Sequence, residues 1–159
     1  MAVIPGKGAI RVIGLDDALH SLNKDIAKVP FRTLKGMIAG GLILQRKSQQ
    51  LVPVDTANLK ASATTLWGTK GGTSTPNFKG DDAAKMEANH KKIVSQEKAG
   101  LSKSVLKPEV EVVYTAAYAI YVHEDLEAKH KVGQAKYLED AAKEAQAEII
   151  AAVKMETKL

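Results

Sequence analysis

Two prolines, Pro30 and Pro53, enclose a long segment with helical periodicity. From Phe31 to Leu42 the large apolar residues recur at steps of three and four, which is the spacing of one face of an amphipathic helix. Pro30 suits the first turn of a helix, where no N–H is needed. Pro53 biases the residue before it away from helical dihedrals. These constraints predict a helix from about Pro30 to Leu51.

A glycine pair, Gly40 and Gly41, lies in the middle of this helix, and the charged residues of the helix are all basic. Each glycine costs roughly 1 kcal/mol relative to alanine in a helix interior. A kink, or a close contact with another helix or subunit, would explain that cost. We favour the contact.

The other periodicities predict a mixture of helices and strands. Apolar steps of four and three indicate a first helix over about 15–29, and an alanine-rich stripe indicates a last helix over about 134–154. The Ser- and Thr-rich segment 60–67 and the alternating segment 109–114 indicate strands. We therefore predict a single α+β domain over residues 1–159, with two N-terminal helices, a small antiparallel sheet, an inserted Lys-rich arm and a C-terminal helix.

The inserted arm covers about residues 69–107. It begins in a loop rich in glycine and threonine, and Asp81 and Asp82 can start a helix that continues to about Lys98. Segment 79–107 holds 7 Lys against 4 acidic residues and few large apolar ones. We expect it to project from the core as an interaction element.

The segment between the long helix and the first strand predicts a tight turn. Asp55 and Thr56 can accept hydrogen bonds from nearby backbone N–H groups, as in an Asx turn or a helix N-cap. Leu59 can anchor the next element in the core. The expected structural turn is formed by Pro53, Val54, Asp55, Thr56 and Leu59.

Composition excludes several kinds of site. The chain has no cysteine, so disulfides, thiolate catalysis and cysteine-ligated zinc are excluded. No segment approaches the roughly 20 apolar residues that span a bilayer, so we expect no membrane contact. Neither a phosphate-binding loop nor a nucleophile motif is found, and we expect neither an enzyme nor a cofactor.

Charge is unevenly distributed along the chain. Residues 1–107 hold 17 Lys and Arg against 8 Asp and Glu, whereas residues 108–159 hold 6 against 10. A basic face could contact nucleic acid, or faces of opposite charge could attract neighbouring copies of the chain. One alternative is therefore a basic DNA-binding accessory protein that contacts phosphates. Another is a metal-dependent hydrolase that uses His123, Glu127 and His130, which would share one face of a helix.

Three motifs follow one another in a fixed order. The first is GLDDAL at 14–19, and the second is PVDTANLKAS at 53–62. The third is YAIYVHE at 118–124, followed by QAKYLE at 134–139. Together they resemble the tail-completion or neck proteins of long-tailed bacteriophages, and the resemblance covers nearly the whole chain except about 69–107.

The chain departs from the family's usual pattern within the second motif. Ala57 stands where the family usually has a glycine, which allows a turn with positive φ. We expect Asn58, which tolerates left-handed dihedrals, to take over that role.

The resemblance implies a non-enzymatic virion component at the head–tail junction, assembled in the host cytoplasm. Such a protein forms a ring with its own copies, for which we expect six. Its partners would be other neck and tail proteins, such as connector, stopper, tail-terminator and tail-tube rings. DNA would pass the lumen without sequence-specific binding.

In such a ring, the basic residues of the long helix would face acidic groups of neighbouring subunits, such as Glu139, Asp140 or Glu144. Tyrosines of the third motif and the head of the last helix would add further contacts. The candidate subunit contacts are Arg32, Lys35, Gly40, Gly41, Arg46, Lys47, Tyr118, Tyr121, His123, Glu124, Lys136 and Tyr137.

Overall fold

The computed structural model describes residues 2–6, 9–13, 20, 23–25, 27–55, 57–68, 71–73, 76–104 and 106–158. Its elements are β1 (Ala2–Gly6), β2 (Ala9–Ile13), α2 (Val29–Leu51), α3 (Asn58–Ala61), β3 (Ala63–Trp67), β4 (Gly71–Gly72), α4 (Ala83–Gly100), β5 (Val110–Tyr114), α5 (Ala119–Glu124) and α6 (Tyr137–Thr157). The predicted α+β class is confirmed. No helix in the described part of the chain is long and apolar enough to cross a membrane.

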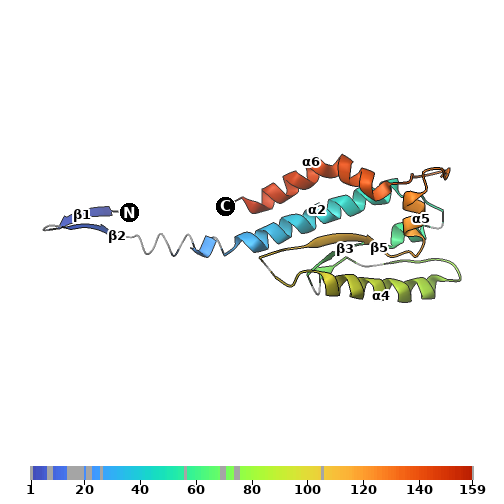
Figure 1. Cartoon of the computed structure of the whole chain (residues 1–159), viewed down its shortest axis with the longest axis horizontal. Helices are drawn as coiled ribbons and strands as arrows, with labels where there is room; N and C mark the ends of the chain where they lie inside the picture. The colour runs from blue at the N-terminus through green and yellow to red at the C-terminus, as the bar shows by residue number, and fades with distance from the viewer. Residues whose placement is uncertain are drawn as a thin grey trace.

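Four layers form the body of the protein (Figure 1). Helix α6 runs back along α2, α2 covers one face of a three-stranded antiparallel sheet, and α4 covers the other face. The strand order is β4-β3-β5, with Ala63 opposite Tyr114 and Trp67 opposite Val110. Because both faces of β3 are covered, even its polar residues Thr64 and Thr65 are fully buried.

The ends of α2 agree with the prediction from the two prolines. The helix begins at Val29 with Pro30 in its first turn, and it ends at Leu51. Val52 already has extended dihedrals, and its N–H still donates to the carbonyl of Ser48 at 2.9 Å. The helix predicted over 15–29 lies largely outside the described residues, where only His20 and residues 23–25 are seen to be helical.

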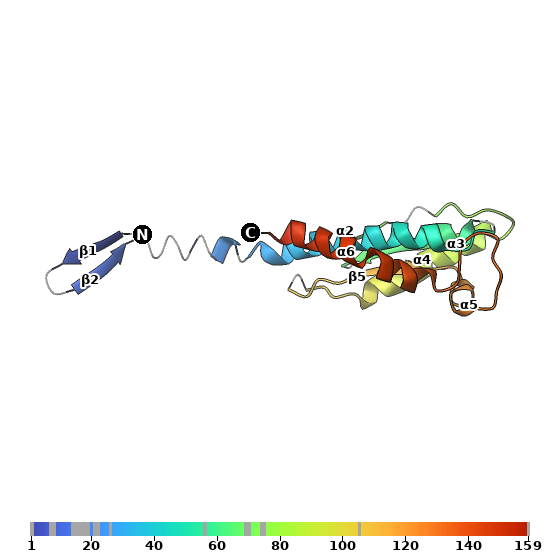
Figure 2. The same ribbon diagram turned by 90° about the horizontal axis from the view of Figure 1, so that it is seen from above.

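The N-terminal strands form a hairpin of their own. β1 pairs with β2 in antiparallel register, from Ala2 opposite Ile13 to Gly6 opposite Ala9. Two views at right angles both draw this hairpin apart from the four layers (Figures 1 and 2).

Glycines let α2 approach its neighbours on two sides. A Cβ added at Gly36 would lie 2.9 Å from the Cα of Val153, and one at Gly40 would lie 2.9 Å from a methyl of Ile149, both on α6. On the other side of α2, a Cβ at Gly41 would lie 2.8 Å from side-chain atoms of the sheet. The predicted close contact is therefore made within one chain. The assignment of Gly40 and Gly41 to a subunit interface stays a prediction.

The backbone contact at Gly36 leads to a testable prediction. Gly36→Ala should lower the free energy of unfolding by about 1–3 kcal/mol, because the added methyl meets backbone atoms of α6 that cannot rotate away. Gly40→Ala should cost less, since Ile149 can change rotamer. The matched control is Gly100→Ala, also in a helix, where an added Cβ meets nothing within 4 Å. Urea unfolding of the three variants would measure these differences, and equal stabilities for Gly36→Ala and Gly100→Ala would contradict the prediction.

The segment 69–107 does not project from the core. β4 pairs with β3, and α4 packs on the sheet face opposite α2. His90 is only 2% exposed and Leu101 only 3%. Two large residues of this Lys-rich segment are thus buried in the body of the protein. The prediction of a projecting arm is wrong.

His90 anchors α4 through a buried polar contact. Its Nδ1 lies 2.6 Å from the hydroxyl of Thr115, and its ring meets the edge of Phe78 with centroids 5.9 Å apart. Burial lowers the pKa of His90 below its ordinary value, and the negative charge of Glu87 opposes this shift. The folded protein therefore favours a neutral imidazole.

This imidazole should make stability depend on pH. The contribution of neutral His90 is fully present above the unfolded-chain pKa of about 6.5 and is lost as pH falls from there toward the lower folded pKa. We expect the free energy of unfolding to fall by up to about 1.4 kcal/mol per pH unit in this range. In His90→Gln, which keeps the other histidines, the slope should be smaller. Urea unfolding at pH 7.5 and 5.5 would measure both slopes, and identical slopes would contradict the assignment.

Candidate functional site

The second and third motifs meet at the end of the body where α2 ends. The N–H of Gln134 donates to the carbonyl of Leu51 at 2.9 Å, and that of Val54 donates to the carbonyl of Val132 at 3.3 Å. The N–H of Lys136 donates to the carbonyl of His123 at 2.8 Å. We call this region, residues 52–62, 118–124 and 132–139, the motif corner. The first motif, 14–19, lies outside the described residues.

A compact apolar core holds the motif corner together. It consists of Val52, Leu59, Ala116, Ala119 and Tyr137. Tyr137 is 2% exposed, and its hydroxyl donates to the carbonyl of Ala119 at 3.0 Å. Its ring meets those of Tyr114 and His123 edge-on, with centroids 5.0 and 4.9 Å away. Tyr137 is therefore a core residue, and its assignment to a subunit contact is wrong.

The turn in the second motif is formed differently from the prediction. Ala57 itself adopts the left-handed conformation, with φ of +63°. Asn58 is helical and buried instead, and its side-chain amide exchanges two hydrogen bonds with the backbone of Lys79, at 2.9 and 2.8 Å. The expectation that Asn58 takes over the positive φ is wrong. Its side chain is already used to bind the loop before α4.

The predicted capping role of Asp55 is also absent from the described residues. Helix α3 begins after Ala57 without a side-chain cap, and the exposed Asp55 forms no hydrogen bond with another described residue. Thr56 lies outside the described part of the chain. Within the predicted turn, buried Pro53 and Leu59 contribute packing, while Val54 and Asp55 face solvent.

Gly133 packs against the backbone at the end of α2 in the motif corner. Gly133 has φ of +86°, and a Cβ there would lie 2.5 Å from backbone atoms of Val52 and Pro53. Only a residue without a side chain allows the chain to approach so closely. This contact fixes the loop before α6 against the end of α2.

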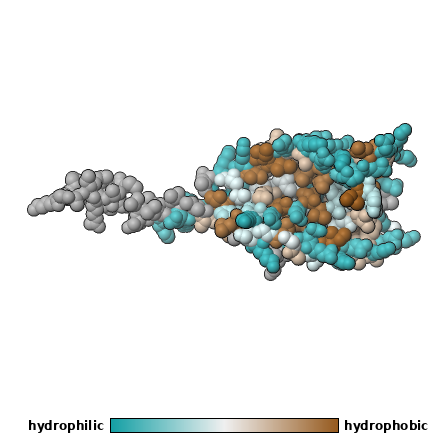
Figure 3. Space-filling view, in the orientation of Figure 1, coloured by the Kyte–Doolittle hydropathy of each residue, from teal (hydrophilic) through white to brown (hydrophobic). Residues whose placement is uncertain are grey.

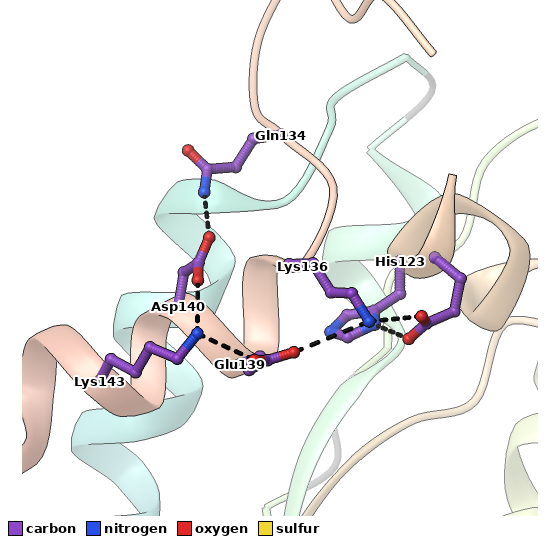
Figure 4. Close-up of polar contacts among 7 residues, drawn as sticks. His123, Gln134, Lys136, Glu139, Asp140 and Lys143 are labelled. Atoms are coloured by element: carbon purple, nitrogen blue, oxygen red, sulfur yellow. Dashed lines mark hydrogen bonds and ion pairs between the residues drawn. The ribbon is translucent and has the colours of Figure 1, made fainter. Parts of the chain in front are cut away.

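A chain of polar contacts surrounds the start of α6 (Figure 4). Lys136 binds Glu124, whose carboxylate also lies 2.7 Å from Nδ1 of His123. The side-chain hydrogen bond with Lys136 is the main cause that lowers the pKa of Glu124, and the same bond raises the pKa of Lys136. The contacts continue through Glu139, Lys143 and Asp140 to Gln134. His123, Glu124 and Lys136 thus join α5 to α6 within one chain.

The basic residues of α2 find acidic partners on α6 of the same chain. Lys35 lies 2.9 Å from Glu156, Arg46 lies 3.3 Å from Glu148, and Lys47 lies 3.0 Å from Glu144. A guanidinium nitrogen of Arg32 donates to the backbone carbonyl of Lys158 at 2.7 Å. Because these pairs are largely exposed, each contributes only about 0–1 kcal/mol. Arg32, Lys35, Arg46 and Lys47 thus have partners within the chain, and their contact with neighbouring subunits stays a prediction.

The histidines suggested as metal ligands do not form a ligand set. Helix α5 ends at Glu124, so His123, Glu127 and His130 do not share one helical face. Within the described residues, no group of three or more His, Cys, Asp or Glu side chains could hold a metal ion. The Nε2 atoms of His123 and His130 are buried without a hydrogen-bond partner among the same residues.

Exposed apolar side chains gather on α5 and the loop that follows it. Tyr121 is 74% exposed, Leu126 69% and Ile120 66%. Val132, in the same loop, lies beside the exposed Val54 through the backbone hydrogen bond given above. We call Val54, Ile120, Tyr121, Leu126 and Val132 the exposed apolar cluster. The sequence predicted a contact role for Tyr121 but not for the other four residues. Apolar residues of the surface and of the core look alike in a sequence, and only the folded structure shows which of them are exposed.

A second apolar surface lies over the middle of the body. Figure 3 shows apolar side chains on the face where α6, α2 and β5 lie. There a shallow groove of about 210 Å³ is lined by Met37, Gly40, Gly41, Leu44, Val110, Val112, Ile149 and Val153. None of the described residues that line this groove is charged.

Comparisons with known proteins add no relative: no protein-family model, no curated protein and no solved structure matches this chain.

Proposed function

We propose that this protein is a structural component of the neck or tail of a long-tailed bacteriophage, forming a ring of its own copies at the head–tail junction. The observation that carries the proposal is the motif corner. Two motifs that are about 60 residues apart in the chain form one hydrogen-bonded unit around a shared core. Such an arrangement supports reading them as a single structural signature.

The exposed apolar cluster favours self-association as the means of assembly. Large apolar side chains grouped on a protein surface commonly mark an interaction site. The cluster lies on the same helix and loop as the third motif. Since Lys35, Arg46 and Lys47 of α2 are paired within the chain, we assign this contact to the apolar side chains of the cluster rather than to the cations of α2.

The alternative of a DNA-binding accessory protein has less support. Phosphate binding needs basic side chains that are available to the nucleic acid. Arg46 and Lys47, which suggested a basic face, have acidic partners on α6. Weak contact with DNA in a ring lumen remains part of the proposal.

Assembly can be tested with the purified protein. We expect native mass spectrometry and electron microscopy to show rings, and Ile120→Asp with Tyr121→Asp to give monomers with unchanged far-UV circular dichroism. Met155→Asp is the matched control, because Met155 is also exposed, at 68%, but lies in the last turn of α6. If the doubly substituted protein still formed rings, the exposed apolar cluster would not be part of the subunit interface.

The role in the virion needs a separate experiment. In the phage that encodes this chain, a nonsense variant of its gene should yield filled heads and separate tails, which electron microscopy would count. Infectious particles of normal form, assembled without the protein, would defeat the proposed function.

A further inference from the structure

A groove of about 590 Å³ lies beside the motif corner. It is bounded by the turn after α2, the start of α4 and α5. The buried Pro53 and Leu59 line it together with Met86, Tyr118 and Val122, so that its lining is largely apolar. The exposed Asp55, Asp81 and Asp82 also line it.

The groove carries an excess of negative charge. None of its three aspartates forms an ion pair with another described residue, whereas Glu144, Glu148 and Glu156 on α6 all do. Lys79 and His130 are the basic side chains in the lining. An apolar lining with a surplus of carboxylates suits a segment that is both apolar and cationic.

The β1–β2 hairpin has this chemistry. Residues 1–13 contain Lys7 and Arg11, no acidic residue, and mostly apolar residues elsewhere. A two-stranded hairpin by itself is at best marginally stable in water and needs a surface to pack against. In both views the hairpin stands apart from its own four layers (Figures 1 and 2).

We propose that the groove binds the β1–β2 hairpin of a second copy of the chain. This inference rests on the self-association in the proposed function and names the contact that closes it. The hairpin precedes the N-terminal end of α2, and the groove lies at its C-terminal end, about 34 Å away for a helix of 23 residues. A contact between two different surfaces of this kind repeats from copy to copy and builds a ring when the rotation closes.

A charge swap tests the pairing directly. Lys7→Glu with Arg11→Glu should reduce the fraction of assembled protein at least tenfold, and so should Asp55→Lys with Asp81→Lys. Combining all four substitutions should restore assembly to within about threefold of the unsubstituted chain. Native mass spectrometry at 0.15 M salt gives the fraction assembled, and far-UV circular dichroism with thermal unfolding confirms that each variant is folded.

Two further variants complete the experiment. Lys103→Glu with Lys107→Glu makes the same change in charge at exposed positions away from the groove, and it should leave assembly unchanged. Deleting residues 2–13 should give folded monomers. Rings formed by the deletion variant would overturn the proposal. The proposal would also be overturned if the four combined substitutions did not restore assembly. The hairpin would then bind elsewhere, for instance in the uncharged groove over α2 or on its own chain.

Failure of this inference and failure of the proposed function have different signatures. If the hairpin-deleted chain formed rings while the nonsense variant left heads and tails unjoined, the result would contradict the hairpin contact and support the proposed function. If the charge swap restores rings but virions form without the protein, the result supports the hairpin contact and contradicts the role in the virion.

Discussion

Tyr137→Ala is expected to lower the free energy of unfolding by about 3–5 kcal/mol, the range for removing a large buried aromatic side chain. Tyr137 is the largest of the fully buried side chains and lies in the core of the motif corner. Its loss would leave a cavity between α5 and α6, because the rings of Tyr114 and His123 both rest against it. Urea unfolding followed by circular dichroism measures the change.

Tyr137→Phe is the matched control for this prediction. It keeps the ring and removes only the hydrogen bond to Ala119, so we expect a loss of about 0.5–1.5 kcal/mol. A Tyr137→Ala protein that is as stable as the original but no longer assembles would reverse the assignment. Tyr137 would then be a subunit contact, as its place in the third motif first suggested.

Deleting residues 76–104 should abolish cooperative folding. The deletion removes α4, the loop that Asn58 binds, and buried His90 and Leu101. It also uncovers one face of β3, where Leu66 is fully buried. Each large apolar side chain that loses its burial costs about 1.5–3 kcal/mol, and a domain of this kind has only about 5–15 kcal/mol in total.

The measurement is thermal unfolding by far-UV circular dichroism, compared with Lys92→Gln combined with Lys103→Gln. This control reduces the positive charge of the segment at two exposed positions and should leave the melting temperature nearly unchanged. A deletion variant that melts cooperatively near the original temperature would show that segment 69–107 is an independent arm after all.

The features that depend mainly on neighbouring residues in the sequence were predicted correctly. The two ends of α2 were predicted because Pro30 and Pro53 act on their immediate neighbours, whatever the rest of the chain does. The strand β5 and the helix α6 followed from periodicity for the same reason. The start of α6 came three residues later than predicted, at Tyr137, because Lys136 takes a left-handed conformation just before it.

Tertiary contacts decided the features that the sequence did not reveal. The composition of segment 69–107 indicated an exposed arm, yet a few residues on one side of α4 suffice to bury it against the sheet. Glu144 was predicted as an acidic partner of α2 in a neighbouring subunit, whereas it pairs with Lys47 of its own chain. No periodicity indicates that α6 folds back on its own α2. At Ala57 the intrinsic preference of Asn58 for left-handed dihedrals was overridden, because the Asn58 side chain binds the backbone of Lys79.

The pairing of α2 with α6 also bears on how the chain is made. Arg46 and Glu148 are separated by 102 positions, and Arg32 and Lys158 by 126. At about 5–20 residues per second on the ribosome, the glycine-lined side of α2 is synthesised roughly 5–20 seconds before α6 exists to cover it. Native packing of α2 against α6 therefore begins only after residues 137–157 have been translated. During that interval the nascent protein exposes an apolar helix face on which chaperones and other nascent copies can act.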